Sequence, residues 1–357
     1  MDVTTEKSEQ QLITSKVKTM PLIDAFNLVD LPALNRNLFS SSDWLKVLYK
    51  TYGCNLYVKY IERDQKVVSY IIYCVVRNFL EWKICICSYC DYCDCYIERP
   101  DDWKVFFESL RAQYPEYRIT VRNLRDETVR MYPEFQVLSK ERFHILEVSD
   151  SLEMVWKRTH DSFRSAVKQS QKSGVIVKRC DKEGLKDFFR LHLNLRKNKY
   201  RLFPQPYRFF DNIWQQYIAQ NQGALLGAYD PQGNFIGGNI YLICGNTLYY
   251  KFNTSSMTAL RYRPNNLLFW EGIKFAKERN LSFIDLGSSG YEQHGLILFK
   301  NHTGAKCQDI THLGFAPPNY KFSQKRILRF TTRFFTQSWM PAFMVRLGSN
   351  FIYPFLA

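Results

Sequence analysis

The chain contains the same order of expected elements twice. In each half a helical segment precedes three strand-like runs, which are followed by a helix that starts at a proline and by one more strand. Short polar turns separate the three runs, so each set predicts a β-meander. The two halves therefore predict an α+β protein of two similar units, each a mixed sheet flanked by helices. The expected strands are 56–61, 67–76, 82–87 and 117–121 in the first half, and 224–229, 235–243, 247–252 and 283–286 in the second.

The segments around the two units differ from them in composition. A basic helix that opens with capping-box spacing at Asp150 is expected to link the units, either as a solvated face or as an anion-binding wall. In the C-terminal tail, arginines at helical spacing predict a helix that covers a hydrophobic edge or an interfacial segment that touches anionic lipid. The expected boundaries are 1–20 for a frayed N-terminus, 21–149 for the first unit, 150–174 for the linking helix, 175–316 for the second unit and 317–357 for the tail, whose spaced arginines are Arg326, Arg329 and Arg333.

Composition limits the classes of partner and of compartment. Hydrophobic residues make up 46% of the chain, enough for two sizeable cores, and the formal net charge is +15. This charge favours anionic partners such as coenzyme phosphates, tRNA, an acidic carrier protein or an anionic membrane face. The sequence shows neither a signal-peptide pattern nor an apolar run of the ~20 residues that span a bilayer. We therefore expect a cytoplasmic protein whose 10 cysteines are mostly reduced.

Half of the cysteines are clustered in the first unit. Alternating cysteines with two-residue gaps are typical of zinc or iron–sulfur sites. No second Cys/His cluster of zinc spacing occurs elsewhere, which favours buried, inert thiols and no bound metal. The cluster consists of Cys85, Cys87, Cys90, Cys93 and Cys95.

The stretch 282–304 concentrates polar chemistry at the end of a strand. The strand 283–286 is expected to break at Gly287 into a Ser/Gly loop that carries Tyr291, Glu292 and His294. Such loops at a strand's carboxyl end are typical of binding or catalytic edges. His294 titrates near neutrality and could take a proton from an amine, although a loop histidine is also an ordinary surface residue.

The known catalytic motifs are absent from the sequence. It contains no nucleophile elbow, Walker loop, dinucleotide fingerprint or HExxH helix. The absence of these motifs leaves reactions that depend mainly on the alignment of two substrates. Acyl transfer to an amine is the prime example. An enzyme for this reaction must align the amine, take its proton and stabilise the oxyanion.

Several short motifs resemble one protein family. The runs 263–268 (Arg-Pro-Asn-Asn-Leu-Leu) and 284–287 (Ile-Asp-Leu-Gly), followed by Gly295, Phe299–Lys300 and Gly304, resemble the FemAB-like branch of the GNAT superfamily. This branch includes CelD-type acyltransferases and the peptidoglycan aminoacyl-tRNA ligases, and it is bacterial in character. The run 88–93 is similar to its Ser-Asp-Tyr motif, and Arg158 and Arg164 match its linker helix. The resemblance covers residues 30–315 and implies tandem GNAT-like domains with a cleft between them.

The resemblance also implies roles for individual residues. Lys300 of the Phe-Lys pair is expected to stabilise the developing charge, and Arg196 with Tyr200 to hold the acceptor. A tyrosine on the last meander strand, Tyr249 or Tyr250, is implied as well, and strand alternation leaves the choice open. The candidate catalytic residues are Lys300, His294 and Tyr250. The candidate substrate-binding residues are Asp91, Tyr92, Arg196, Tyr200, Phe299, Arg263, Asn265 and Ser288.

One departure from the family concerns the coenzyme. Ordinary GNAT enzymes cradle the pyrophosphate in a Gly-rich turn at a helix start, where this chain has Pro264 after Arg263. The helix N-terminus can still attract an anion, but close backbone approach is less favoured. The long coiled-coil arm of some tRNA-using ligases is also missing.

Together these observations predict an N-acyltransferase. We expect it to transfer an acyl group from a thioester on coenzyme A or an acyl carrier protein to an amine of a peptide, sugar or cell-envelope precursor, without a tightly bound cofactor. The alternative within enzymes is an aminoacyl-tRNA-dependent ligase acting on a peptidoglycan precursor. An alternative of another class is a non-catalytic protein that binds at the inner face of the membrane through the tail, where the enzyme could also be peripheral.

Overall fold

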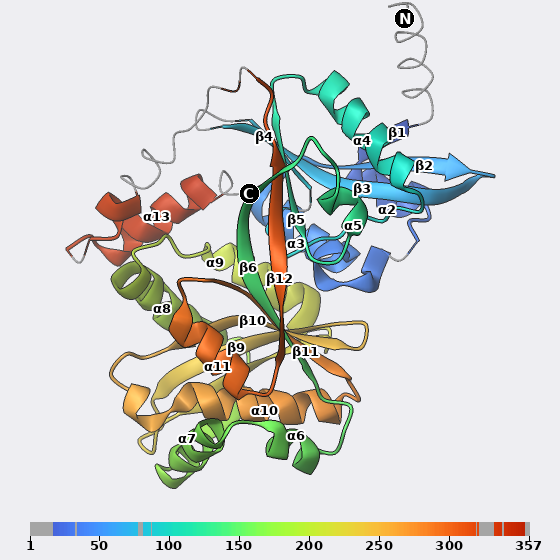
Figure 1. Ribbon diagram of the computed structural model, residues 1–357. Coiled ribbons are helices and arrows are strands. Elements are labelled where there is room, and N and C mark those ends of the chain that lie inside the picture. The colour runs from blue at the N-terminus through green and yellow to red at the C-terminus, as the bar shows by residue number, and fades with distance from the viewer. Residues whose placement is uncertain are drawn as a thin grey trace, which may run out of the picture. The chain divides into compact units, whose positions relative to one another are not determined.

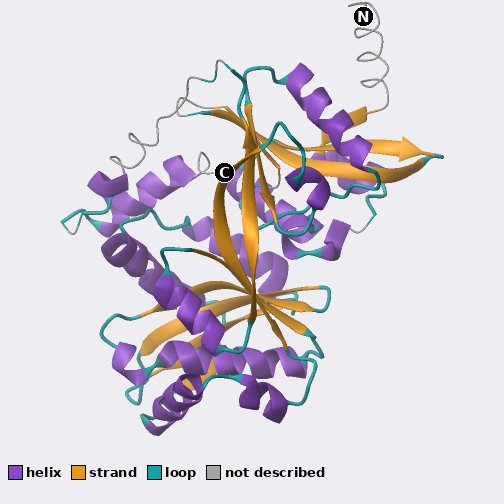
Figure 2. Ribbon diagram, viewed as in Figure 1, coloured by secondary structure: helices purple, strands orange, loops and turns teal. Residues whose placement is uncertain are grey.

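The computed structural model describes residues 17–32, 34–77, 81–86, 88–318, 320, 332–337 and 339–353. These residues form two compact units (Figure 1). Unit 1 contains the described residues up to Lys140 together with 310–320, and unit 2 contains Glu141–Asp309 together with the described part of 327–354. In both units helices lie against strands (Figure 2).

Unit 1 contains an antiparallel meander with one parallel strand beside it. Its strands follow the order β1-β2-β3-β4-β5-β12, in which β4 and β5 are parallel and the end of β12 pairs antiparallel with β5. Its elements are β1 (Val17–Pro21), α2 (Leu22–Leu28), the 3-10 turns η1 (Leu34–Arg36) and η2 (Leu38–Ser40), α3 (Ser42–Tyr52), β2 (Leu56–Arg63), β3 (Lys66–Arg77), β4 (Trp82–Ile86), α4 (Pro100–Gln113), β5 (Arg118–Asn123), α5 (Glu127–Arg130), the start of β6 (Gln136–Glu147) and the end of β12 (Lys306–Phe315).

The helices of unit 1 begin and end where the sequence provides caps. The side chain of Ser41 accepts a hydrogen bond from the Trp44 amide at the start of α3, and Gly53 ends the helix with a φ of 62°. Helix α4 buries Trp103 and Phe107 completely in a core that also contains Ile119 of β5. Burial of one such side chain contributes about 1.5–3 kcal/mol, so these residues fix the helix on the sheet.

Unit 2 repeats the arrangement with its own meander. Its strands follow the order β6-β11-β10-β9-β8-β7, and β10 and β11 are the parallel pair. Its elements are the end of β6, α6 (Leu152–Arg158), α7 (Asp161–Lys172), β7 (Ile176–Arg179), α8 (Gly184–Asn194), the π-helical turn η3 (Leu195–Tyr200), α9 (Tyr207–Ile213), the π-helical turn η4 (Trp214–Ile218), β8 (Gly223–Tyr229), β9 (Phe235–Cys244), β10 (Thr247–Ser255), the 3-10 turn η5 (Leu260–Tyr262), α10 (Pro264–Glu278), β11 (Phe283–Gly290), α11 (His294–His302), the start of β12 and α13 (Ala342–Ile352).

The core of unit 2 is organised around α10. This helix packs between the sheet and α7 (Figure 1), and it buries Leu268 and Ile273 completely. A Cβ atom added at Gly272 would lie 2.2 Å from the hydroxyl oxygen of Tyr241, so α10 approaches β9 as closely as it does because this position lacks a side chain.

The predicted duplication of element order and the α+β fold class are confirmed. In unit 1 a meander leads through α4 to the parallel strand β5, and in unit 2 a meander leads through α10 to β11. Strands β6 and β12, which follow the parallel strand of each unit, were not predicted. The domain boundaries stay a prediction.

Three local predictions are wrong. Residues 17–20 are not frayed, because they belong to β1, which pairs with β2; residues 1–16 lie outside the described part. The linking helix is two helices, α6 and α7, with a break at Thr159–His160. The stretch after Gly287 is no Ser/Gly loop, since β11 continues to Gly290 and α11 begins at His294.

The prediction for the tail falls largely on residues that are not described, Arg326 and Arg329 among them, and stays a prediction. The described part of the tail contains helix α13.

Eight cysteines of the described residues take part in no disulfide bond, in agreement with mostly reduced thiols, whereas Cys93 takes part in one. Cys85, Cys90 and Cys95 are buried thiols, and burial raises the pKa of the Cys95 thiol well above its usual value. Cys87 lies outside the described residues. Within the described ranges, no group of three or more His, Cys, Asp or Glu side chains is placed to hold a metal ion.

Candidate active site

Strands β10 and β11 of unit 2 run side by side for a short distance and then separate. Their parallel ladder contains three residue pairs and ends at Tyr249 and Asp285. Both strands shift register just after this point, β10 against β9 and β11 against β6, and both continue to Ser255 and Gly290 along those outer neighbours. Their carboxyl ends therefore carry backbone groups that no longer pair with each other.

Lys300 lies at this divergence. Its side chain is 2% exposed, and its Nζ atom donates hydrogen bonds to the carbonyl oxygens of Gly287 and Ser288, each at 2.9 Å. These carbonyls belong to the irregular part of β11, where the strand cannot pair regularly. The ammonium thus satisfies buried acceptors and brings a positive charge to the end of the strand.

Asp285 shapes the same irregularity from the strand itself. Its carboxylate is buried, and Oδ1 accepts a hydrogen bond of 2.7 Å from the amide of Gly287, whose φ is 68°. The side chain therefore fixes the backbone of the strand end.

His144 of β6 is a buried group that the sequence analysis missed. It is completely buried, its Nε2 lies 2.9 Å from Asn301 Oδ1 of α11, and its Nδ1 has no partner. Burial lowers its pKa, and the charges of Lys300 and Arg142 lower it further. The imidazole is therefore neutral near pH 7. Because Nε2 must donate its proton to the amide oxygen, Nδ1 carries the free lone pair.

A second buried polar atom without a partner lies on the same face. Arg142 and His144 share one face of β6, and Ser289 of β11 is the cross-strand neighbour of Arg142. Ser289 is 1% exposed, and its hydroxyl has no hydrogen-bond partner. Such atoms occur elsewhere in the described residues as well; these two are distinguished because His144 is within electrostatic reach of Lys300 and Ser289 follows Ser288, whose carbonyl accepts from Lys300.

The start of α10 contributes a chain of amide side chains near the end of β10. Asn253 donates to Asn239 Oδ1 at 2.7 Å and to Asn265 Oδ1 at 3.2 Å, and Asn265 donates to Ser255 Oγ at 3.4 Å. Arg263 precedes the helix in the left-handed conformation, with a φ of 54°, and is exposed. A non-glycine residue thus occupies the left-handed position directly before Pro264.

Tyr250 and Phe299 belong to the apolar wall on the α10 side. The two side chains are half-buried and both meet the ring of Phe269, Tyr250 at 5.5 Å and Phe299 at 5.9 Å between ring centroids. Burial raises the pKa of Tyr250, and the nearby Tyr200 adds to the shift, so the phenol keeps its proton. Tyr249 is buried and adjoins Asp285 in the parallel ladder.

Arg196 and Tyr200 lie in the π-helical turn η3. The guanidinium of Arg196 donates to the Phe203 carbonyl from Nε at 3.1 Å and from Nη2 at 3.0 Å, which holds the turn after the helix. Tyr200 is 49% exposed. It contributes to the raised pKa of Tyr250, so this turn lies within electrostatic reach of β10.

Three predicted residues do not belong to these groups. His294 begins α11 and is exposed, whereas Lys300 on the same helix is buried. Asp91 and Tyr92 belong to unit 1, where Asp91 is half-buried and Tyr92 packs edge-on against Phe39 at 5.3 Å. Ser288 is half-buried, and its carbonyl accepts from Lys300.

Unit 1 contains a basic pocket of about 420 Å³ on one face of its sheet, beside the Ser88–Cys93 motif. Arg122 of β5 donates to the Cys90 carbonyl at 3.0 Å, and His312 of β12 pairs with Ser139 Oγ at 3.0 Å. The basic residues of its lining are Lys83, Arg118, Arg122 and His312, and Glu81 is the acidic one. Such a lining suits an anionic group.

The site in unit 2 can support addition of an amine to a carbonyl. A buried ammonium lies at the point where β10 and β11 separate, and a neutral imidazole whose Nδ1 has no partner lies within electrostatic reach of it. The positive charge can stabilise a developing oxyanion, and the imidazole can accept a proton.

Comparison with known proteins identifies the domain that contains this gap. Residues 157–294 match the family model described as the acetyltransferase (GNAT) domain, which confirms the recognised superfamily. A comparison with the curated proteins finds none that matches this sequence.

Solved structures with the same fold cover most of the chain. FemX matches with a TM-score of 0.63 at 13% identity, over 88% of this chain and 100% of its own. L-PGS from Bacillus licheniformis matches with a TM-score of 0.52 at 11% identity, over 86% and 95%. A tandem GNAT protein from the clavulanic acid biosynthesis pathway matches with a TM-score of 0.52 at 9% identity, over 85% and 100%. The fold of the FemAB-like GNAT branch is thereby confirmed.

Proposed function

We propose that this chain, which contains a GNAT domain, is an N-acyltransferase whose second unit carries the chemistry. The donor is an acyl thioester on coenzyme A or on an acyl carrier protein, and the acceptor is an amine of a peptide, a sugar or a cell-envelope precursor. The observation that supports this most strongly is the divergence of β10 and β11 after Tyr249 and Asp285, with the ammonium of Lys300 held beside it.

In the proposed reaction the neutral amine attacks the thioester carbonyl. The C–N bond forms first, while the C=O π bond opens and its electron pair moves to oxygen as an oxyanion. The amine proton passes to a base, the C=O bond re-forms as the C–S bond breaks, and the leaving thiolate takes up that proton. The charge of Lys300 stabilises the oxyanion that forms in between. His144 is the better placed base, because its lowered pKa keeps it neutral and its Nδ1 is free, whereas His294 is exposed.

Binding roles follow from the surroundings of this gap. Tyr250 and Phe299 form an apolar wall for the acyl chain, and Asn265 with Arg263 at the start of α10 binds the anionic part of the donor. Arg196 and Tyr200 hold the acceptor, and Ser288 contributes through the carbonyl that orients Lys300. In unit 1, Asp91 and Tyr92 directly follow Cys90, which lines the basic pocket, and we assign them a substrate-binding role within that unit.

The alternative donor is an aminoacyl-tRNA, as in a ligase that extends a peptidoglycan precursor. The fold similarity to FemX and the net charge of +15 favour it. A protein that binds at a membrane surface without catalysis is the remaining alternative. In each case we place the protein in the cytoplasm or at the inner face of the membrane.

A release assay tests the donor class directly. Purified protein is incubated with acyl-coenzyme A thioesters of increasing chain length and a mixture of amines, and free thiol is measured with and without ribonuclease. We expect thiol release that requires an amine and survives ribonuclease. Release that needs charged tRNA would favour the ligase, and no turnover with either donor would overturn the enzyme assignment.

The Lys300→Met variant tests the site. It keeps an unbranched side chain that is one atom shorter and removes the charge, and we expect turnover to fall by about 100-fold or more, as for loss of one oxyanion donor. Lys306→Met is the matched control, because the Lys306 side chain is 83% exposed and lies 3.7 Å from Glu147. Equal turnover of the two variants would remove Lys300 from the proposed mechanism.

A further inference from the structure

Helix α13 of unit 2 has one buried face and one apolar face open to solvent. Val345 and Ser349 are completely buried, and Gly348 packs against the ring of Phe203. On the outer side, exposed apolar side chains recur every four residues along one line of the helix. They are Phe343, which is 61% exposed, Leu347 at 53% and Phe351 at 73%.

The segment before α13 extends this apolar face. Trp339 is 65% exposed and Phe334 is 47% exposed, and their rings meet edge-on at 5.8 Å. Hydrogen bonds from the body of unit 2 hold the segment in place. Lys197 donates to the Met340 carbonyl and Arg201 to the Thr336 carbonyl, each at 2.6 Å. The exposed rings are therefore presented by a fixed segment.

The sequence that contains this apolar face carries charge of one sign. The sequence from Ile310 to Ala357 contains no Asp or Glu residue, although it contains six lysines and arginines. Of these, Arg333 and Arg346 lie within the described residues. A long stretch without a carboxylate, combined with exposed aromatic rings, is the composition that suits the headgroup layer of an anionic membrane.

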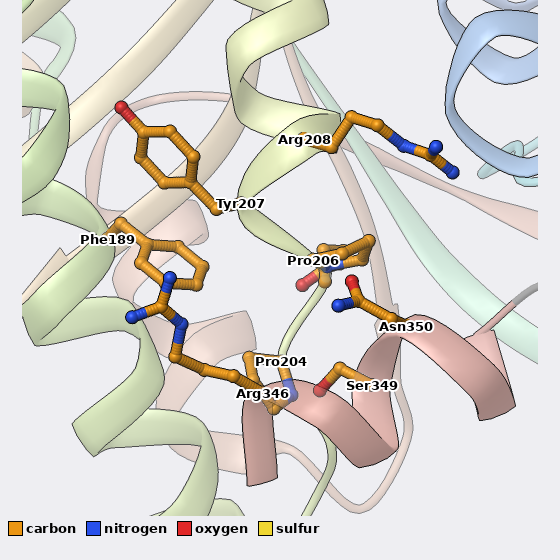
Figure 3. A pocket seen from close by; sticks show the side chains of 9 residues that line it. Phe189, Pro204, Pro206, Tyr207, Arg208, Arg346, Ser349 and Asn350 are labelled. Carbon is orange, nitrogen blue, oxygen red and sulfur yellow. The ribbon is translucent and has the colours of Figure 1, made fainter. Parts of the chain in front are cut away.

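A pocket of about 360 Å³ opens beside the helix, between α13 and the turn that leads into α9 (Figure 3). The guanidinium of Arg346 extends from α13 over the ring of Phe189, 5.7 Å from its centroid. Tyr207, Arg208, Ser349 and Asn350 line the rest, and no lining residue is acidic. The pocket therefore places hydrogen-bond donors and positive charge next to the apolar face.

We propose that the outer face of α13, with Trp339 and Phe334, docks unit 2 on the surface of a membrane that contains anionic phospholipid. The phosphate of a headgroup lies at the Arg346 pocket while the exposed rings enter the acyl boundary. The helix has 11 residues and is about 16 Å long, too short to cross a bilayer, so it lies in the plane of the surface. Across the described residues, no helix is long and apolar enough to span a membrane. This docking does not depend on the acyl-transfer proposal.

Vesicle sedimentation tests the docking surface. Full-length protein is mixed with vesicles of phosphatidylcholine alone or of phosphatidylcholine with phosphatidylglycerol, and the bound fraction is measured at low and high salt. We expect binding to the anionic vesicles that weakens with salt. A triple variant with serine in place of Phe343, Leu347 and Phe351 should bind these vesicles about tenfold more weakly or worse. Arg346→Gln should weaken it by about fivefold on anionic vesicles.

Matched variants separate docking from general hydrophobicity. The control is a triple variant with serine in place of Met131, Met154 and Met257. These side chains are 74%, 49% and 51% exposed, and they lie outside α13. We expect this protein to bind like the wild type. Equal losses from the two triple variants, or binding that ignores phosphatidylglycerol, would overturn the proposal. Thiol release with soluble substrates should be unchanged in the α13 variant, so the two proposals fail separately.

Trp339 provides a direct readout of depth. In vesicles with brominated acyl chains, we expect wild-type tryptophan fluorescence to be quenched and the Trp339→Phe protein to lose most of this quenching. Sedimentation velocity without lipid tests the other occupant, a second copy of this chain. A wild-type dimer that the α13 serine variant converts to monomer would show that this face joins two copies and would overturn membrane docking.

Discussion

The Nζ atom of Lys300 lies 2.9 Å from the carbonyl oxygen of Gly287, at the point where β11 leaves its parallel neighbour. Gly287 has a φ of 68°, a conformation that other residues adopt only with strain. The amide of this glycine donates to Asp285, and its carbonyl accepts from Lys300. The irregular strand end and the buried charge therefore depend on each other, which makes Lys300 a structural residue as well as the candidate catalytic one.

Substitution by alanine should change the stability of unit 2 differently at two glycines of this region. Gly287→Ala forces a side chain into the left-handed region, and we expect unit 2 to lose about 1–2 kcal/mol of unfolding free energy. Gly295→Ala lies in α11, where nothing is within 4 Å of the added Cβ, so it should be neutral or stabilising by up to about 1 kcal/mol. Urea unfolding of both variants measures the difference. A larger loss at Gly295 would contradict this account of the strand end.

Removal of the Lys300 charge should also lower stability. In Lys300→Met the carbonyls of Gly287 and Ser288 lose their donor, and a buried acceptor without a partner costs about 1–3 kcal/mol. Urea unfolding should show this loss, whereas Lys306→Met should unfold like the wild type. If Lys300→Met is as stable as the wild type and yet inactive, the lysine acts in catalysis alone.

Acid should destabilise unit 2 through His192. This side chain is buried against Phe188 and Phe210, and burial, reinforced by the charge of Arg196, lowers its pKa to about 3. In the unfolded protein the pKa of His192 is about 6.5. Below that pH the unfolded state binds a proton that the folded state does not, so the free energy of unfolding falls until the pH reaches the pKa of the folded protein. Between about pH 6.5 and pH 5 the free energy of unfolding falls by about 2 kcal/mol.

Denaturant unfolding at about pH 7.5 and about pH 5 measures the effect. The lowered pKa values of His144 and His302 act in the same direction. His192→Leu should therefore reduce the pH dependence of stability without removing it. An unchanged difference between the two pH values would show that His192 does not carry this part of the acid sensitivity.

Arg164 should matter for stability more than its neighbours on α7. Its guanidinium donates to the carbonyls of Trp156 at 3.3 Å and Lys157 at 3.2 Å, and also to that of Thr159, and so joins α6 to α7 across their break. Arg164→Ala should cost about 1–3 kcal/mol. Lys168→Ala, at an exposed position of α7, should change stability by less than about 0.5 kcal/mol. Thermal unfolding of the two variants tests this comparison.

Much of the fold could be predicted because its signals are local. Turn residues, prolines at helix starts and runs of β-branched residues are signals between residues that are close together in the chain. They define the two meanders and the helices α4 and α10. The stretch 282–304 was likewise identified as the second unit's polar strand end, although its loop is a longer strand and a helix. Lys300 was selected by resemblance, and its hydrogen bonds to β11 were not predicted.

The missed candidates have a common cause. His144 and Ser289 lie on one face of the sheet because β6 pairs with β11, which lies more than a hundred residues further along the chain. The exposed first half of β6 obscures the alternation of its buried second half, so the sequence gives no strand signal there. Neither histidine nor serine stands out in isolation, and only the pairing shows that both are buried without a partner.

By itself the sequence determined the order of the elements and the repetition of that order, since turns, helix starts and strand propensity depend on neighbouring residues. The tertiary structure decided which strands pair, where the parallel ladder of β10 and β11 ends, and that Lys300 is buried there while His294 on the same helix is exposed. These features arise from hydrogen bonds and packing between residues distant in the chain, whose partners no local pattern specifies.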